Sequence, residues 1–389
     1  MNKNNEPSPD ERLSALREAI DQVDLELLQL FNRRMEFSQE VGRIKASNSL
    51  SLFVPGREEL IIQRLLAANT GPLAETSLRA IYREIFAASR LLQYVLQVAY
   101  LGPEWTYSHL AALSLFGHAA RYLPCSTLED VFDSLLKNKV HAAVVPVENS
   151  LQGGDGRTMD LLYERDVRVV SECYIELAHC FCSRLESIRE VKTLYAHPQA
   201  MEQCRSWVFD QLREAEWHEC KSTAQAAQMA QKDPLGGAIC NLYAGHHYGL
   251  RILAERIEDH PGNTTRFFAL ANQLNQRTGN DKTSLLFALS DQPGALHAAL
   301  EAFAHAGVNI TRIESRPNRL FPWQYLFYAD IEGHHEDTEV QDALNVLKDR
   351  VRFLKILGSY IKGDPQKPIR FEKENIRQAP SLGRQDYGS

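Results

Sequence analysis

The chain has 389 residues, which is enough for two or three domains that each bury a core. Its hydrophobic content of 44% and charged content of 24% are ordinary for a globular protein, and its net charge of −7 argues against general nucleic-acid binding. No stretch approaches the roughly 18 apolar residues of a membrane-spanning helix, and the first residues lack the apolar core of a signal peptide, so we expect a cytoplasmic protein without a membrane partner.

Cysteine and histidine spacing argues against a metal site. The seven cysteines are scattered and include no CxxC pair, and the 13 histidines include no HExxH motif. We therefore expect reduced thiols, no bound metal and no cofactor.

The first region, residues 1–97, has the pattern of a helical domain. It predicts one long helix, a second near 56–68 and a third near 74–97, with a break at TGPLAE. Apolar residues in the long helix recur at steps of three and four, and Arg34 occupies a position on that apolar seam. The apolar positions are Leu13, Leu16, Ile20, Val23, Leu27, Leu30, Phe37, Val41 and Ile44.

The position of Arg34 on this seam has two interpretations. A seam arginine often extends its guanidinium group to water. Alternatively it binds a buried anion, and Lys45 favours this, because the 11 residues between them span about 16 Å of helix. Arg17 lies 17 residues before Arg34, about 25 Å along a straight helix, which is too far for both to hold one small molecule. If Arg17 belongs to the same site, a second copy of the helix must supply it, which predicts a dimer.

The remainder of the chain divides into two further regions and a tail. Residues 98–275 alternate short apolar runs with helical patterns, which predicts an α/β domain with mostly parallel strands. The expected strands are 98–102, 141–147, 192–197, 237–241 and 266–271. Residues 282–361 show the order strand, helix, strand, strand, helix, strand of a small α+β domain. The polar composition of residues 362–389 predicts a disordered tail.

The helical region resembles the all-helical chorismate mutase domain. The resemblance rests on LREAIDQVDLELLQLFNRRMEFSQEVGRIK (16–45), PGREE (55–59) and IFAASRLLQ (85–93). It implies a dimer with exchanged long helices, in which Arg17 reaches the partner's site. Val54 stands where the family often has an acidic residue, and a backbone contact there would bind substrate. The residues implied to line the near wall are Arg34, Lys45, Arg57, Glu58, Ser89 and Gln93.

The middle region resembles prephenate dehydratase along its length, which implies a two-lobed α/β domain similar to periplasmic binding proteins. The segments that carry the resemblance are YLGPEWTYSHLAA (100–112), VVPVENS (144–150), YAHPQAMEQC (195–204), STAQAAQMA (222–230), YGLRILAERIED (248–259) and NTTRFFAL (263–270).

The dehydratase resemblance also implies site residues. Thr265 would contact the departing hydroxyl group, with Glu148 and Asn149 nearby and Arg266 holding a carboxylate. Ser222 and Thr223 are implied substrate contacts, although Ser222 with Gln225 also fits a helix capping box. Trp105 replaces a usual glycine, so the loop differs there or the ring covers the site.

The last region resembles an ACT domain with a ferredoxin-like α+β fold. DQPGALHAAL (291–300) and TRIESRPNRLFPW (311–323) match segments that bind phenylalanine in this enzyme class. Without the other family segments, the preferred explanation would be that GAL begins a helix and Arg316 is a surface charge. The implied effector-binding residues are Gly294, Ala295, Leu296, His297, Glu314, Ser315, Arg316 and Pro317.

Together the resemblances imply a homodimeric or larger bifunctional enzyme of phenylalanine biosynthesis. It would convert chorismate to prephenate and prephenate to phenylpyruvate, and L-phenylalanine would inhibit it. Two alternatives are a dehydratase that prefers arogenate and a non-catalytic phenylalanine sensor with degenerate enzyme domains. The polar set from Arg17 to Gln93 and the TTRF segment argue against the sensor.

Overall fold

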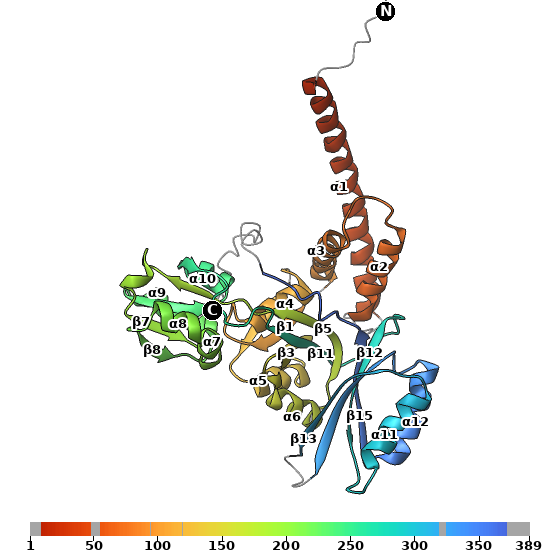
Figure 1. Ribbon diagram of the computed structural model, residues 1–389. Coiled ribbons are helices and arrows are strands. Elements are labelled where there is room, and N and C mark those ends of the chain that lie inside the picture. Colours follow the sequence, from red (N-terminus) through yellow and green to blue (C-terminus); the bar gives the residue numbers. More distant parts are fainter. Residues whose placement is uncertain (1–8, 48–54, 94, 119, 319–323, 372–389) are drawn as a thin grey trace, which may run out of the picture.

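The computed structural model describes residues 9–47, 55–93, 95–118, 120–318 and 324–371. A helical region comes first, followed by an α/β region built on two sheets and then by a sheet with two helices on one face (Figure 1). The fold class that the sequence predicts for each region is confirmed.

The helical region contains α1 (Pro9–Ser47), α2 (Pro55–Ala68) and α3 (Glu75–Gln93). Helix α3 packs against both α1 and α2, and Ile62, Leu78 and Phe86 form a small buried core. The three predicted helices are confirmed, although the third ends at Gln93 because the chain enters a strand at Gln97.

The apolar seam of α1 is exposed over its N-terminal half, which projects beyond α2 and α3 (Figure 1). Six seam side chains are 41–62% exposed, namely Leu13, Leu16, Ile20, Val23, Leu27 and Leu30. A single copy of the chain therefore does not bury the apolar face that the sequence pattern defines.

The first lobe of the α/β region is a mixed sheet in the order β2-β1-β3-β11-β5, with β4 paired to β3. Strand β1 runs parallel to β2 and β3, whereas β11 runs antiparallel to β3 and β5. The strands are β1 (Gln97–Leu101), β2 (Arg121–Cys125), β3 (Ala142–Asn149), β4 (Gly153–Gly154), β5 (Arg168–Glu176) and β11 (Thr264–Ala271). The helices are α4 (Tyr107–Phe116), α5 (Leu128–Leu136) and α6 (Gly156–Glu164).

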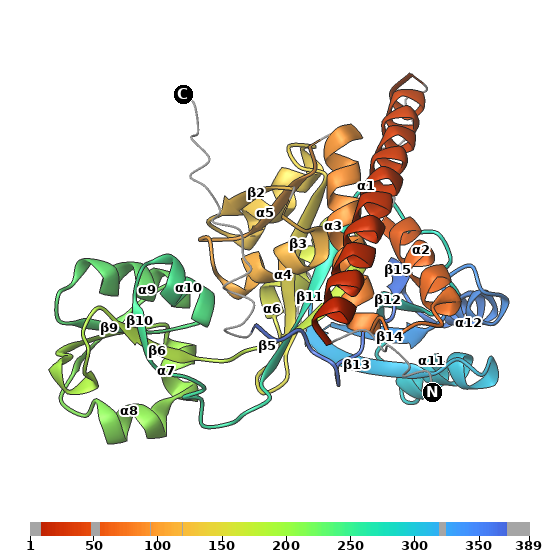
Figure 2. The ribbon, with the colours of Figure 1, turned by 90° about the horizontal axis from the view of Figure 1, so that it is seen from above.

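The second lobe is a sheet in the order β10-β6-β9-β7-β8, which the chain enters after β5 and leaves before β11 (Figure 2). The prediction of mostly parallel strands holds in this lobe for β7, which runs parallel to β8 and β9. It is wrong for β6, which pairs antiparallel with β9 and β10. It is also wrong for β11 of the first lobe, which pairs antiparallel because the chain returns there from the second lobe. The strands are β6 (Cys180–Ser183), β7 (Thr193–Ala196), β8 (Glu216–Glu219), β9 (Gly236–Cys240) and β10 (Arg251–Ala254). The helices are a short 3-10 helix (Ile188–Glu190), α7 (Pro198–Gln203), α8 (Arg205–Gln211), α9 (Thr223–Lys232) and α10 (Leu242–His247).

The C-terminal domain is an antiparallel sheet in the order β13-β14-β12-β15, and its predicted alternation of strands and helices is confirmed. Helices α11 and α12 bury one face of this sheet around Phe303 and Leu347. The elements are β12 (Asp281–Ala288), α11 (Ala295–His305), β13 (Ile310–Pro317), β14 (Tyr325–Glu332), α12 (Thr338–Arg350) and β15 (Phe353–Ile361).

The opposite face of the C-terminal sheet shares a core with the first lobe. Leu286, Leu326, Tyr328, Leu357 and Tyr360 from this sheet belong to the same buried cluster as the apolar residues of β3, α5 and α6. The Tyr328 hydroxyl also donates to the backbone carbonyl of Met159, at 2.7 Å. The C-terminal domain and the first lobe are therefore packed as one body.

Residues 362–371, the start of the segment for which the sequence predicts disorder, run back across the first lobe. Ile369 forms a parallel bridge with Ile175 of β5, and the ring of Phe371 lies 5.2 Å from that of Tyr243 in the second lobe. Residues 372–389 lie outside the described residues.

Candidate active sites

The predicted mutase residues converge where α1 crosses α3. The Arg34 guanidinium donates to the Ser89 hydroxyl, which in turn donates to the Ile85 carbonyl at 2.7 Å. Arg34 also lies over the ring of Phe86, with its guanidinium carbon 5.4 Å from the ring centre. Burial lowers the pKa of Arg34, while Tyr82 and Glu58 oppose that shift. The arginine is thus held between helices and not extended into water.

Three further predicted residues lie near the C-terminal end of α1. Burial and the nearby Arg57 lower the pKa of Lys45, so these two cations face a common space. Gln93 approaches α1 closely, because a Cβ atom on Gly42 would lie 2.8 Å from the Gln93 side chain. The ends of three helices therefore present cations and an amide to one place, an arrangement suited to a small dicarboxylate.

Arg17 of the same chain is not part of this cluster. Arg17 is exposed on the projecting half of α1, and Val54 lies outside the described residues. Glu58 pairs with Arg90, a buried residue that the sequence analysis did not select. Arg90 also donates to the Phe116 carbonyl of α4 at 2.7 Å, so it joins the helical region to the first lobe.

Asn149 and Thr265 form the centre of the predicted dehydratase site. They are directly opposite each other on β3 and β11, and the Asn149 amide donates to the Thr265 hydroxyl at 2.9 Å. The same amide contacts the side-chain oxygen of Asn263 at 2.6 Å. Asn149 is thereby fixed in orientation, and Thr265 is 8% exposed.

Glu148 and Arg266 are the next opposed pair on these strands, but they make different contacts. Arg266 is 2% exposed, and its guanidinium lies 2.7 Å from Glu172, 2.6 Å from Asp330 and 3.1 Å from Glu148. Burial lowers the pKa of Arg266, but Tyr360, Asp330 and Glu172 outweigh this and raise it overall. The Arg266 guanidinium thus binds carboxylates of the protein itself, whereas the resemblance implies that it binds a carboxylate of the substrate.

Ser222 and Thr223 lie in the second lobe, at the start of α9. The Ser222 hydroxyl accepts from the Gln225 backbone, so the predicted helix cap is confirmed. The reciprocal bond of a capping box is not made to Ser222, because the Gln225 side chain accepts from the backbone of Lys221, one residue earlier, at 2.7 Å. A contact between the lobes comes from Gln199, which the sequence analysis did not select, and which donates to Gln152. Gln199 lies within the HPQ stretch of a family segment, which was the available signal.

Trp105 adopts the backbone conformation expected of a glycine, with φ of 67°. Its indole ring packs on His109 of the first lobe and His247 of the second, and its carbonyl accepts from Asn241 of the second lobe at 2.7 Å. The interlobe contacts compensate for the backbone strain of a non-glycine residue in this region.

The predicted effector residues lie on two elements of the C-terminal domain. Gly294, with φ of 82°, precedes α11, where Ala295 is half-buried and Leu296 and His297 are exposed. On the edge strand β13, Ser315 and Pro317 are exposed, while Glu314 and Arg316 are half-buried. A Cβ atom on Gly154 would lie 2.5 Å from the Glu314 carboxylate, so this strand packs tightly on the first lobe.

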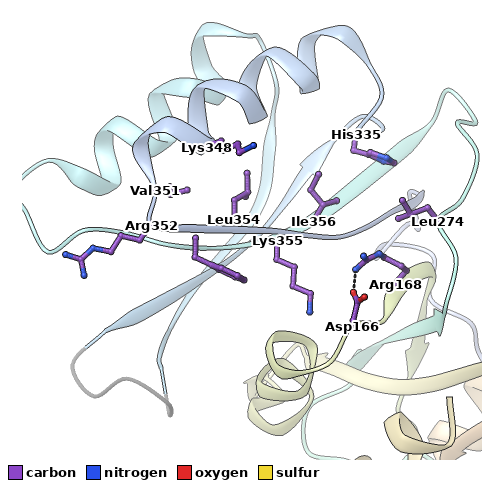
Figure 3. A pocket seen from close by; sticks show the side chains of 11 residues that line it. Asp166, Arg168, Leu274, His335, Lys348, Val351, Arg352, Leu354, Lys355 and Ile356 are labelled. Carbon is purple, nitrogen blue, oxygen red and sulfur yellow. Dashed lines mark ion pairs between the residues drawn. The ribbon is translucent and has the colours of Figure 1, made fainter. Parts of the chain in front are cut away.

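Two cavities lie away from these residues. One, of about 780 Å³, lies between the first lobe and the surface formed by β15 and the end of α12 (Figure 3). Four basic residues border it, namely Arg168, Lys348, Arg352 and Lys355. Its Lys355 donates to carbonyls at the end of α6, including that of Leu162 at 2.8 Å. A smaller cavity, of about 260 Å³, lies between the lobes beside Phe371. None of the described residues predicted for the two active sites lines either cavity.

Comparison with known proteins defines the class of the protein. Residues 16–94 match the type II chorismate mutase family, residues 98–275 the prephenate dehydratase family and residues 283–349 the ACT domain family. The chain is therefore an enzyme that joins a mutase, a dehydratase and an ACT domain.

Similar proteins identify the family. The chain is 42% identical to the bifunctional chorismate mutase/prephenate dehydratase of Aquifex aeolicus, over 90% of this chain and 98% of that protein. It is 36% identical to arogenate dehydratase 2 of Petunia hybrida, over 68% of this chain and 71% of that protein. It also matches the crystal structure of prephenate dehydratase from Arthrobacter aurescens in complex with L-Phe, with 33% identity, a TM-score of 0.63 and coverage of 70% of this chain and 92% of the other.

The chain belongs to the family of bifunctional chorismate mutase/prephenate dehydratases. It has both activities and acts in phenylalanine biosynthesis, with chorismate and prephenate as substrates, so the alternative of a non-catalytic sensor is set aside. In the part of the chain that the structure describes, no helix has the length and apolar character needed to cross a membrane.

Proposed function

We propose that the mutase site is completed across a homodimer, with Arg34, Lys45, Arg57, Glu58, Ser89 and Gln93 from one chain and Arg17 from the other. The observation that supports it is the exposed apolar half of α1, which carries Arg17 about 25 Å along the helix from Arg34. A second copy of α1 that buries this face would bring its own Arg17 to the cluster. Isologous dimers pair the same surface of each copy in this way.

The proposed mutase mechanism needs orientation and charge stabilisation, with no nucleophile. Conversion of chorismate to prephenate is an intramolecular rearrangement, so the arginines would hold the two carboxylates in the reactive geometry. Lys45 and Gln93 would donate to the ether oxygen, on which negative charge grows as its bond breaks. Glu58 would accept from a substrate hydroxyl group.

Mixed dimers test the shared mutase site. Co-expression of an Arg17→Ala chain with an Arg34→Ala chain places both lesions in one site of each heterodimer and leaves the other site intact. With random pairing, about a quarter of wild-type mutase activity should return, although each homodimer alone is inactive. If heterodimers form and no activity returns, Arg17 does not act across the dimer.

We propose that the Thr265 hydroxyl donates a hydrogen bond to the departing hydroxyl group of prephenate, which leaves together with CO2 as the ring becomes aromatic. The supporting observation is that Thr265 accepts from Asn149, which leaves its own hydrogen available for the substrate. Ser222 and Thr223 would contact substrate from the second lobe. Glu148 is a weaker candidate for the donor, because it pairs with both Arg266 and Arg312.

Variants of Thr265 test this assignment within the full chain. Thr265→Ala should lower dehydratase kcat by about 10²- to 10³-fold, the effect of losing one donor aimed at a developing charge. Thr265→Ser keeps the hydroxyl group and should recover most of that loss, while mutase activity stays unchanged in both. Near-normal turnover in Thr265→Ala would remove Thr265 from the mechanism.

We propose that L-phenylalanine binds the ACT domain and inhibits the dehydratase. The ACT match and the L-Phe complex of the Arthrobacter relative support this. Calorimetric titration of the full chain should show saturable phenylalanine binding, which Leu296→Ala weakens together with inhibition. If Leu296→Ala leaves binding and inhibition unchanged, the start of α11 is not part of the effector site.

A further inference from the structure

The strands β3 and β11 carry two opposed pairs of polar residues on opposite faces. Thr265 faces Asn149 and Arg266 faces Glu148, and neighbouring residues on a strand alternate in direction. The first pair forms the proposed reaction centre, so the second pair is directed away from it. The two pairs share the same backbone, and a displacement of one displaces the other.

The second pair is held by Glu172 of β5 and also by the C-terminal domain. Asp330 of β14 binds the Arg266 guanidinium at 2.6 Å and accepts from the Ser284 hydroxyl at 2.5 Å. The Tyr360 hydroxyl of β15 accepts from the same guanidinium at 3.0 Å. Asp330 is 3% exposed, so this ion pair is shielded from solvent and salt.

A second connection reaches the same strands from β13. Arg312 binds Glu148 at 2.5 Å and also pairs with Glu314. The Glu314 carboxylate packs on Gly154, which is paired to Glu148 through β4. Glu148 therefore lies between the guanidinium of the catalytic strand and that of the regulatory edge strand.

We propose that Asp330 is a positioning residue for the dehydratase reaction, which acts through Arg266 to hold Thr265 in register with Asn149. The Arg312–Glu148 pair gives the regulatory domain a second connection to the same strands. This proposal rests on the proposed roles of Thr265 and Asn149. It assigns the arginine of the TRF segment to the contact between domains and not to the substrate. A change in the regulatory sheet would then reach the reaction centre through two ion pairs.

Asp330→Asn tests the proposal, because it keeps the shape of the side chain and removes its charge. Glu332→Gln is the matched control, since it removes a carboxylate two residues along β14 that is paired with Lys362. Dehydratase kcat in Asp330→Asn should fall roughly 2- to 30-fold, the range for residues that couple distant sites, with a smaller change in KM. Mutase activity of the same preparation and all parameters of Glu332→Gln should match wild type.

Combination with Thr265→Ala separates positioning from general stability. If Asp330 acts through Thr265, Asp330→Asn should cause little further loss of residual turnover once the hydroxyl group is absent. An equal fractional loss in both backgrounds would overturn the proposal, as would a kcat no lower than that of Glu332→Gln. If Thr265→Ala alone retains normal turnover, the proposed reaction centre fails instead.

A milder variant covers the case in which Asp330→Asn does not fold. Arg312→Gln removes the second connection at a side chain that is 15% exposed. It should lower dehydratase kcat within the same range and weaken inhibition by phenylalanine relative to its calorimetric binding. Unchanged kcat and unchanged inhibition in folded Arg312→Gln would overturn the proposal.

Discussion

The two candidate sites differ in how far a single chain brings their predicted residues together. In the helical region, Arg34 and Ser89 meet but Arg17 lies far along an exposed apolar helix. In the α/β region, Asn149 and Thr265 are joined by a hydrogen bond on paired strands of one sheet. A small helical unit has too little core to enclose its own ligand, whereas a sheet can hold two residues in register.

The largest effect that distinguishes the two regions is expected for Arg34→Ala. Removal of one partner of a buried charged hydrogen bond costs about 2–5 kcal/mol, so mutase kcat/KM should fall roughly a thousandfold. Dehydratase activity on supplied prephenate should remain near wild type, because no predicted residue is shared between the sites. Both activities are measured on one preparation, with exposed Arg43→Ala of the same helix as the control. Equal loss of both activities would show that the regions are not independent.

A smaller effect is expected from acid, and it should appear in the α/β region. Burial lowers the pKa of His109 from 6.5 to about 4, and its ring stacks on Tyr100 and accepts from the Trp105 backbone. Below pH 6.5 the unfolded chain binds a proton at this histidine, whereas the folded protein keeps it neutral. The free energy of unfolding is therefore unaffected by this group above pH 6.5 and decreases as the pH falls toward 4. The loss approaches roughly 3 kcal/mol at the low end.

Tryptophan fluorescence measures that loss selectively. All four tryptophans lie after residue 97, so their signal excludes unfolding of the helical region. Urea midpoints should decrease between pH 6.5 and 4 in wild type, and His109→Gln should flatten this decrease. A wild-type midpoint that rises on acidification would contradict the assignment.

The smallest effect is expected for Ser222→Ala, which separates two roles of one residue. Loss of the cap of α9 should lower the free energy of unfolding by about 1 kcal/mol. Thr223→Val tests the neighbouring hydroxyl without altering the cap. If Ser222→Ala slows dehydratase turnover far more than its stability change explains, the residue contacts the substrate as well.

Periodicity in the sequence predicted the helices and most central strands, but it did not identify what each element packs against. The seam of α1 has a clear helical period, yet its N-terminal half remains exposed in one chain. Strand β8 (Glu216–Glu219) was missed because all four residues are exposed and the strand has no apolar alternation.

The residues of the candidate dehydratase site were predictable from the sequence, but the partners of Arg266 were not. The family segment identified Thr265 and Arg266 together, and strand alternation alone places neighbours on opposite faces. The partners of Arg266 were beyond sequence reasoning, because Glu172 and Asp330 lie 94 and 64 residues away in the chain. Only the packing of the C-terminal sheet on the first lobe brings these charges together.

The core shared by the first lobe and the C-terminal sheet has a consequence for protein engineering. Deletion of the ACT domain would expose the lobe surface against which Leu286, Leu326, Tyr328, Leu357 and Tyr360 pack. At about 2 kcal/mol for each buried side chain, the loss of roughly 10 kcal/mol equals the net stability of a typical domain. An enzyme intended to escape feedback control should therefore keep strands β12 to β15 and carry point substitutions at the proposed effector residues of β13 and the start of α11.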